Sequence, residues 1–134
     1  MLGLARRKIL GAFRQFEQKK AISVFTLPWP SKALSPNNSP HWSARARARA
    51  SYRHQCATQA RKQGARAMEA TSLWVAITFV PPDRRRRDLD NCLASFKAGI
   101  DGLADVLGVD DSKWKLEIAM SPDIGGFVKV EVMA

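Results

Sequence analysis

The most regular apolar pattern in the chain is helical and lies between residues 89 and 107. Apolar side chains recur there at intervals of three and four residues, at Leu89, Leu93, Phe96, Ile100, Leu103 and Leu107. This spacing lines one face of an α-helix. Asp88 precedes the pattern and Gly108 follows it, and these residue types commonly begin and end helices. We therefore expect an amphipathic helix over residues 89–107.

Four other segments have the patterns of β-strands. Residues 22–27 and 72–80 are apolar runs that end at prolines, and the second is apolar on both faces, as central strands are. Residues 114–120 and 127–132 instead alternate between apolar and polar, which is typical of half-buried strands. Between these two, residues 122–126 include proline and glycine turn residues. The pattern predicts that the last two strands form a β-hairpin.

A second helix is expected over residues 42–66, which are rich in Ala, Arg and Gln. It would place Arg45, Arg49 and Arg53 on one face, either to contact phosphate groups or as a merely solvated surface. Gly64 would weaken or end this helix. The resulting order β-α-β-α-β-β indicates a single α+β domain, over residues 21–134, in which two helices pack on one mixed β-sheet.

Residues 1–20 stand apart from this domain. They combine basic side chains with apolar residues at roughly helical intervals: Leu2, Ile9, Leu10, Phe13 and Phe16. Such a segment suits a basic amphipathic extension that lies on the domain, on DNA or on a lipid surface. The alternative interpretation is an upstream translation start or a poorly ordered arm.

The charge balance favours a polyanionic partner. Among 134 residues, 22 are Lys or Arg and only 12 are Asp or Glu, so the formal net charge is +10. Nucleic acid is the first expectation for that partner, and an anionic membrane surface is the second. No apolar run approaches the roughly 20 residues of a membrane span, so no stable membrane association is expected.

The cysteines and histidines show no metal-binding spacing. Cys56 and Cys92 lie far apart, and we expect them to be reduced thiols of a cytoplasmic protein. His41 and His54 likewise form no ligand pattern, so a zinc site is not expected. The first residues are interrupted by basic side chains, unlike the apolar core of a signal peptide.

The strongest candidate for chemistry is the segment 82–91, in which four consecutive arginines precede Asp88 and Asp90. Two carboxylates about 4 Å apart repel by roughly 4 kcal/mol at an effective dielectric near 20, so the pair needs a cation, a shared proton or arginine partners. A divalent metal held by Asp oxygens, beside phosphate-binding arginines, suits phosphodiester hydrolysis. The same residues also fit an ordinary helix start, with Asp88 as N-cap and the arginines in a solvated loop.

Three segments carry a resemblance to a known family. They are an opening segment at residues 27–31 with an asparagine-bearing loop at 35–38, the acidic motif at 83–91, and an acidic turn at 108–112. In that order they resemble the RusA-type Holliday junction resolvases of phages and prophages. The middle segment, an arginine run followed by Asp-x-Asp-Asn, is the most specific of the three.

The resemblance implies a RusA-like fold and a homodimeric, Mg²⁺-dependent endodeoxyribonuclease, with Mn²⁺ as an alternative ion. Such an enzyme resolves four-way DNA junctions by paired symmetric nicks during recombination and repair, in the cytoplasm of a bacterial or phage-infected cell. Its metal ligands here would be Asp88, Asp90 and Asp111, with Asp110 beside the last.

The functional lysine of the family usually lies four residues after the second Asp of this motif. Here that position is Ala94, and the nearest candidate is Lys97, on the same helical face. The resemblance and the basic patterns together suggest a set of DNA-binding residues: Arg84, Arg85, Arg86, Arg87, Arg45, Arg49, Arg53, Asn37 and Asn38.

Two interpretations in other classes remain open. One is a non-catalytic basic DNA- or RNA-binding protein in which the aspartates only cap helices and form turns. The other is a membrane-surface or partner-binding protein that uses residues 1–20. Cleavage of branched DNA with Mg²⁺ but not with EDTA separates the nuclease from the first of these.

Overall fold

The structure is a computed structural model and describes residues 23–38 and 41–133, so the extension predicted at residues 1–20 lies outside the described residues. The elements, in chain order, are β1 (Ser23–Pro28), η2 (Lys32–Leu34), α3 (Trp42–Lys62), β2 (Leu73–Val80), α4 (Leu89–Leu107), η3 (Asp111–Lys113), β3 (Trp114–Met120) and β4 (Phe127–Met133). The predicted α+β class and the predicted order of α-helices and strands are confirmed.

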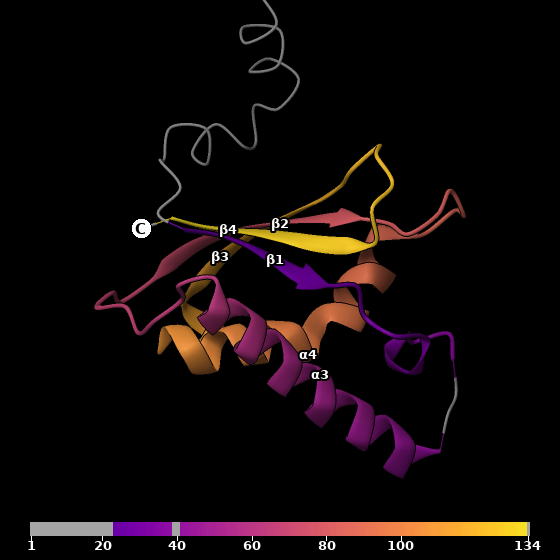
Figure 1. The fold of residues 1–134 in the computed structure, drawn as a ribbon, viewed down its shortest axis with the longest axis horizontal. Helices are drawn as coiled ribbons and strands as arrows, with labels where there is room; N and C mark the ends of the chain where they lie inside the picture. Colours follow the sequence, from indigo (N-terminus) through magenta and orange to yellow (C-terminus); the bar gives the residue numbers. More distant parts are fainter. Residues whose placement is uncertain (1–22, 39–40, 134) are drawn as a thin grey trace, which may run out of the picture.

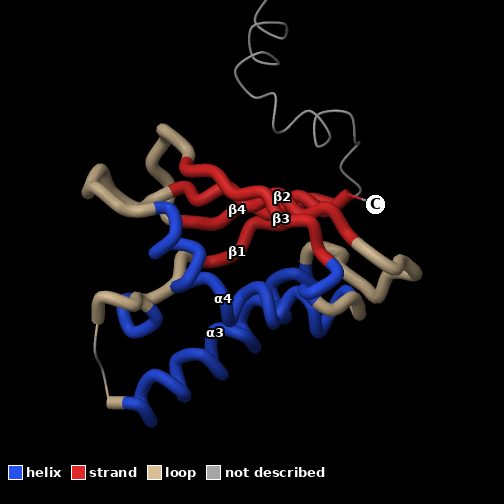
Figure 2. Tube along the Cα trace, turned by 180° about the vertical axis from the view of Figure 1, so that it is seen from behind, coloured by secondary structure: helices blue, strands red, loops and turns tan. Residues whose placement is uncertain are grey.

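The strands form one mixed sheet in the order β1-β4-β2-β3. β4 pairs antiparallel with β1 and with β2, whereas β2 and β3 run parallel. β2 therefore has a neighbour on each side, as predicted for a central strand. Because parallel neighbours need a crossover connection, α4 passes beneath the sheet between β2 and β3. Both α-helices lie against the same face of the sheet (Figures 1 and 2).

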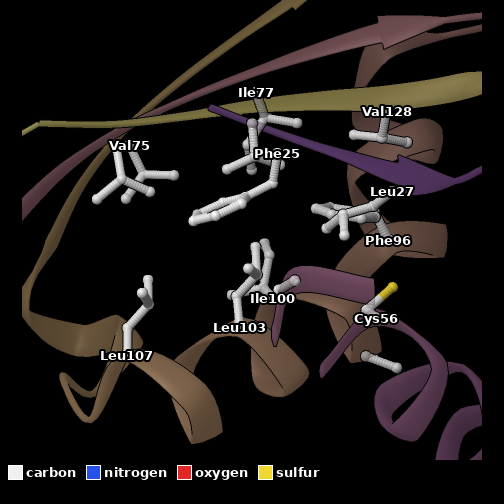
Figure 3. Close-up of a cluster of buried hydrophobic side chains, with 14 of the residues drawn as sticks. Phe25, Leu27, Cys56, Val75, Ile77, Phe96, Ile100, Leu103, Leu107 and Val128 are labelled. Carbon is white, nitrogen blue, oxygen red and sulfur yellow. The ribbon is translucent and has the colours of Figure 1, made fainter. Parts of the chain in front are cut away.

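The hydrophobic core lies between this face and the two helices (Figure 3). Phe96 of α4 meets Phe79 of β2 and Tyr52 of α3 edge to face, at ring-centroid distances of 5.9 and 6.1 Å. Edge-to-face aromatic pairs contribute about 0.5–1.5 kcal/mol beyond the area that they bury. Alternate residues of the strands complete the core: Phe25, Leu27, Val75, Ile77, Val128, Val130 and Val132.

The ends of the helices follow from local sequence. α4 begins and ends where predicted, and Gly108 adopts φ 72°, in the left-handed region that favours glycine after a helix. Asp88 takes the N-cap position, although its side chain makes no capping hydrogen bond. α3 ends at Lys62, earlier than the predicted residue 66, and the chain turns at Gly64 with φ 97°.

The predicted hairpin between the last two strands is wrong. β3 and β4 are not paired with each other, because β2 lies between them. The segment that joins them crosses the end of β2, where the Ser121 amide donates to the Phe79 carbonyl and the Gly125 amide to the Pro81 carbonyl, each at 2.8 Å. Alternating polarity identifies a half-buried strand, but it does not identify the strand's neighbour.

The two α-helices cross closely at Gly102. A Cβ atom at this position would overlap the backbone carbonyl oxygen of Arg53 in α3 and would lie 3.3 Å from the backbone nitrogen of Ala57. Backbone atoms cannot move aside without shifting the whole helix, so glycine is what permits this approach.

We expect Gly102→Ala to lower the free energy of unfolding by about 1–3 kcal/mol, as overpacking of a tight core does. Ala104→Ser, at a half-exposed position of the same helix, serves as the control and should cost no more than about 0.5 kcal/mol. Urea denaturation followed by circular dichroism measures both. Equal stability of the two variants would contradict the close crossing.

Candidate metal site and nucleic-acid interface

A cleft of about 780 Å³ opens beside the first turn of α4. It is bordered by the segment that follows β1, by the loop between β2 and α4, and by α4 itself. Its polar and charged lining residues are Ser31, Lys32, Ser35, Asn37, Asp83, Arg85, Arg86, Arg87, Asp88, Asn91 and Ser95. The fold thus gathers cationic side chains and two carboxylates around one opening, from segments that are distant in the chain.

Asp88 and Asp90 present their carboxylates at this end of α4. Both residues are exposed. Within residues 23–38 and 41–133, neither carboxylate takes part in a hydrogen bond or an ion pair. Asp90 lies in the first turn of the helix, where the helix dipole favours a negative charge. The two carboxylates are therefore available to a cation, and they also satisfy the ordinary requirements of a helix start.

Arg87 is anchored more firmly than the arginines before it, of which Arg85 makes a longer ion pair with Asp83, at 3.9 Å. Its Nη1 lies 2.8 Å from Asp83 Oδ1, its guanidinium carbon lies 5.5 Å from the centre of the Trp29 ring, and its side chain is only 20% exposed. This pairing, helped by a hydrogen bond from the Arg85 amide, holds the pKa of Asp83 below its usual range. The remaining arginines of the run are exposed: Arg84, Arg85 and Arg86.

Sequence reasoning missed the contacts that hold this loop. Asp83 and Arg87 are four residues apart with opposite charges, which is a signal that was available in the sequence. Trp29 is distant in the chain, and its ring packs edge to face on Phe79 at a centroid distance of 6.2 Å as well as beneath Arg87. Only the fold brings this ring to the loop.

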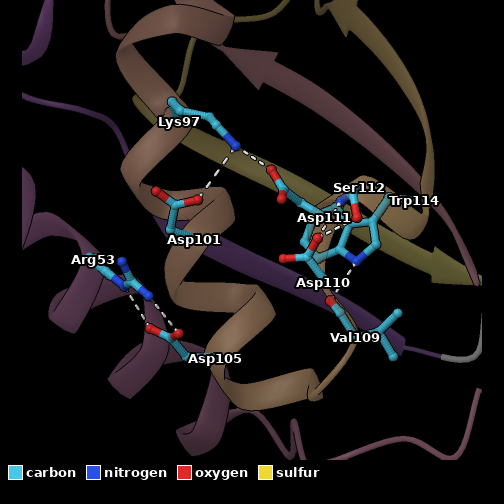
Figure 4. A network of polar contacts seen from close by, with 9 residues as sticks. All are labelled: Arg53, Lys97, Asp101, Asp105, Val109, Asp110, Asp111, Ser112 and Trp114. Carbon is cyan, nitrogen blue, oxygen red and sulfur yellow. Dashed lines mark hydrogen bonds and ion pairs between the residues drawn. The ribbon is translucent and has the colours of Figure 1, made fainter.

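Lys97 lies two helical turns beyond Asp90 and joins two acidic residues (Figure 4). Its ammonium nitrogen pairs with the Asp111 carboxylate and lies 3.4 Å from Asp101 Oδ1. The bond to Asp111 is the main cause of a raised Lys97 pKa. The stabilisation that a raised lysine pKa provides is fully present at any pH below the unfolded pKa, which is near 10.4. It is lost as the pH rises through the higher pKa of the folded state. The pairing is therefore complete at neutral pH.

The turn before β3 is built to hold Asp111 in this position. The Asp110 carboxylate accepts hydrogen bonds from the Ser112 amide, at 3.2 Å, and from the Ser112 hydroxyl, and these bonds lower the pKa of Asp110. The indole nitrogen of Trp114 donates to the Val109 carbonyl oxygen at 2.9 Å. Asp110 thus acts as the cap of η3, while Asp111 turns toward Lys97.

The three carboxylates predicted as metal ligands are not gathered into one group. Among the described residues, no set of three or more His, Cys, Asp and Glu side chains is placed to hold a metal ion. Asp111 is paired with Lys97, whereas Asp88 and Asp90 stand at the start of α4. Mg²⁺ is commonly held by one or two carboxylates together with waters and phosphate oxygens, so the Asp88 and Asp90 oxygens fit such an ion. The three-ligand site stays a prediction.

A second cleft, of about 670 Å³, lies between α3 and α4. Lys97 and Ala94 border it from α4. From α3 it is lined by the predicted basic face, Arg45, Arg49 and Arg53. The prediction that these three arginines share one face is confirmed.

Two arginines of this face are already engaged. Arg53 binds both carboxylate oxygens of Asp105, each at 2.7 Å, and Arg45 donates to the backbone carbonyls of Ser35 and Asn38. Arg49 makes no hydrogen bond or ion pair within the described parts of the chain.

The predicted DNA-binding asparagines differ in the same way. The Asn38 side chain donates to the Lys32 carbonyl at 2.9 Å, while Asn37 lines the first cleft. Some predicted DNA-binding residues, such as Arg45, Arg53 and Asn38, are therefore held by hydrogen bonds to other parts of the protein. Others, such as Arg49 and Asn37, line the clefts with side chains that make no such bond among the described residues.

Comparison with known proteins leaves the family open. No protein-family model matches the chain. A protein of Xylella fastidiosa (strain Temecula1), described as an "Uncharacterized protein", is 42% identical over 100 residues, which are 71% of this chain and 64% of that protein. The chain thus spans less than two thirds of this relative. Within the described residues, no helix has the length and apolar character needed to cross a bilayer.

Arg87→Ala should lower the melting temperature by several degrees, because it removes the Asp83 ion pair and the stacking on Trp29 at a largely buried position. Arg86→Ala, at an exposed neighbouring position, is the matched control and should leave the melting temperature unchanged. Differential scanning calorimetry of both variants compares them. Equal melting temperatures would show that Arg87 is as dispensable to the fold as Arg86.

Proposed function

We propose that this chain is a Mg²⁺-dependent endodeoxyribonuclease, similar to RusA-type Holliday junction resolvases, which nicks four-way DNA junctions. The observation that carries the proposal is the pair of uncommitted carboxylates, Asp88 and Asp90, beside a cleft lined by Lys32, Arg85 and Arg86. A site that cleaves a phosphodiester needs acidic oxygens for a divalent cation next to cationic groups for phosphate. Most other acidic side chains in this region are paired with lysine or arginine.

Asp88 and Asp90 would hold the ion, Mg²⁺ or Mn²⁺. When bound, it would neutralise charge on the scissile phosphate and activate a water for hydrolysis. The chain's own residues have distinct tasks around it. Arg85 and Arg86 bind phosphate oxygens of the DNA backbone, and Arg87 holds the loop that carries them. Charge-assisted hydrogen bonds of this kind fix the strand relative to the two carboxylates.

Lys97 is the candidate for the lysine of the family. It lies about 10 Å along the helix axis from Asp90, which follows from seven residues at 1.5 Å each. Its four-carbon stem is flexible, and its side chain is 56% exposed. We infer that it leaves Asp111 when DNA binds and donates to a phosphate oxygen, so that Asp111 becomes free to act near the metal.

The DNA would extend from the first cleft to the second. Arg49 is the uncommitted cation of the α3 face, and Lys97 borders the same cleft. A net charge of +10 favours such a path, since phosphate contacts dominate the affinity of DNA-binding proteins. Two copies related by a two-fold axis would present two such sites to opposed strands, which the symmetry of a four-way junction requires.

A non-catalytic nucleic-acid-binding function is the second candidate. The observation that favours it is that, in the described part of the chain, no three potential ligands are placed around one metal position. Asp88 also occupies an N-cap position, which is an ordinary place for aspartate. In that case the clefts bind DNA or RNA and the two carboxylates only begin a helix.

The experiment that separates the candidates is a cleavage assay on four-way junction, fork and linear duplex DNA. The proposal expects nicks at symmetric positions of the junction with Mg²⁺ or Mn²⁺, and none with EDTA. Retardation of all three substrates without any cleavage would instead support the binding protein.

Asp90→Asn should abolish junction cleavage and preserve junction binding, because it removes a ligand's charge while keeping its shape. Glu69→Gln, at an exposed acidic position that lines neither cleft, is the control and should cleave at nearly the wild-type rate. Gel assays of cleavage and of mobility shift measure both variants. A wild-type rate for Asp90→Asn would remove this residue from the site.

Lys97→Ala should lower single-turnover cleavage by about 10²-fold or more, as loss of one transition-state donor typically does. Junction affinity should hardly change, because one phosphate-side charge among many is a small share of binding. A readout independent of activity is Mn²⁺ binding, which should not weaken, since the variant frees Asp111. Normal cleavage together with a slightly lower melting temperature would make Lys97 a surface residue that only orders Asp111.

A further inference from the structure

Trp42, at the start of α3, is an aromatic side chain that the core does not use. Of the large apolar side chains that the described structure leaves exposed, it is the most exposed, at 76%. From Trp42 to Ser51 no residue of α3 is buried, and Tyr52 is the first to enter the core. Figures 1 and 2 show this part of the helix projecting away from the sheet. The indole is therefore presented to solvent rather than packed.

The Trp42 ring is supported by its neighbour in the chain. The His41 ring lies against it at a centroid distance of 5.6 Å, with 35° between the two planes. His41 is itself held in place, because its Nδ1 lies 2.8 Å from the Ser43 hydroxyl oxygen and accepts from the Ser43 amide at 3.3 Å. A ring that is already ordered loses little conformational entropy when a ligand stacks on it. His41 and Trp42 thus form a small aromatic platform at the end of α3.

Cationic side chains continue from this platform along the same face of α3. At about 100° per residue, Arg49 and Arg53 lie within roughly 20° of Trp42 around the helix axis. Arg45 lies within roughly 60° of it, and all three arginines line the second cleft. Arg49 is about 10 Å from Trp42 along the axis. Because Ser95 lines both clefts, one continuous path leads from the platform through the second cleft to the first.

We propose that His41 and Trp42 form a base-stacking site, which binds an unpaired base of a DNA strand while Arg49 binds a phosphate of the same strand. Sites for single strands commonly combine a cationic groove with aromatic rings, and stacking tolerates any base because every base has a π-face. Inside a continuous duplex, both faces of a base are covered by its neighbours. The site therefore selects bases that are unstacked, in single strands or at a branch point.

The surroundings of Trp42 favour a base over a lipid surface or a protein partner. Between Trp42 and Tyr52 the helix carries only Ser, Ala and Arg. A helix that lies on a membrane presents a wide apolar face, which this segment lacks. A protein-binding hot spot is surrounded by packed contacts that exclude water, and no large apolar side chain of this segment adjoins Trp42. One planar ring beside cations instead matches the bases and phosphates of a nucleic-acid strand.

This inference rests on the proposed function for the identity of the polymer, and it adds a preference that the nuclease chemistry does not supply. Contacts to phosphates act on the backbone, which duplex and branched DNA share. A stacking site distinguishes the two, because an uncovered base is available in single-stranded or branched DNA. Trp42 thereby directs the chain toward branch points, while the carboxylates at the start of α4 serve the metal.

The test is the affinity of the full chain for labelled oligothymidine and for a duplex of equal length, measured by fluorescence anisotropy in EDTA so that no cleavage occurs. Trp42→Ala should raise the dissociation constant for oligothymidine about five- to hundredfold, as loss of one stacked base does, and should hardly change that for duplex. Trp42→Phe keeps a planar ring and should retain most of the affinity. Trp42→Leu, which is apolar but not planar, should behave like the alanine variant.

Two further variants control for charge and for exposed apolar surface. Arg49→Ala should weaken binding of oligothymidine and of duplex, because it removes a phosphate contact that both substrates offer. Val24→Ala shortens another exposed apolar side chain, 49% exposed on β1, and should leave both affinities unchanged. Circular dichroism melts of all these variants should match the wild type, since none of the replaced side chains is buried.

A photochemical cross-link locates the contact directly. Oligothymidine that carries one iodouracil base should attach to Trp42 or His41 on irradiation, and mass spectrometry of the digested product identifies the position. The Trp42→Ala variant should lose most of this product, whereas Val24→Ala should form it at the wild-type yield.

Equal affinity of the wild type and Trp42→Ala for oligothymidine would overturn the stacking site, as would equal losses for oligothymidine and duplex or a cross-link at another position. Trp42-dependent binding to phosphatidylserine vesicles, with unchanged affinity for oligothymidine, would assign the side chain to a lipid surface instead. Trp42-dependent binding of single strands without junction cleavage would overturn the proposed nuclease alone. Junction cleavage by a chain whose Trp42→Ala variant binds single strands normally would overturn the stacking site alone.

Discussion

The packing of α4 beneath the central strand β2 is the contact on which the rest of the structure depends. Phe96 lies between Phe79 and Tyr52, and this aromatic cluster sets the rotation of α4 about its axis. Because side chains three or four residues apart share a helical face, the same rotation sets the directions of Asp90 and Lys97. The geometry of the candidate site is therefore a consequence of apolar packing, which also limits how far a polar side chain can be repositioned.

Charge pairing then decides which polar side chains remain available. Arg87 pairs with Asp83, Arg53 with Asp105, and Lys97 with Asp111. These pairs order the loop, the helix crossing and the turn before β3. The residues left without such partners in the described structure include two carboxylates at the start of α4 and several arginines. A uniformly basic surface would have no unpaired carboxylates beside its arginines. The presence of both kinds of unpaired charge at one end of α4 is what marks this region as a candidate reaction site.

The crossover from β2 through α4 to β3 also links the candidate site to the edge of the sheet. Since β3 is parallel to β2, α4 must return along the sheet before the chain enters β3. The return places Asp111 at the start of the edge strand, against the middle of α4.

The sequence by itself determined what depends on neighbouring residues. It predicted both ends of α4 and the strand character of β1, β2, β3 and β4, because periodicity, an N-cap and a left-handed glycine are local properties. Tertiary structure decided the pairing of strands, for which alternating polarity carries no information, and the hairpin prediction failed for that reason. It also decided that Lys97 meets Asp111, fourteen residues away, and that Trp29 supports Arg87. Such contacts depend on how α4 packs against the sheet, a packing that no short segment encodes.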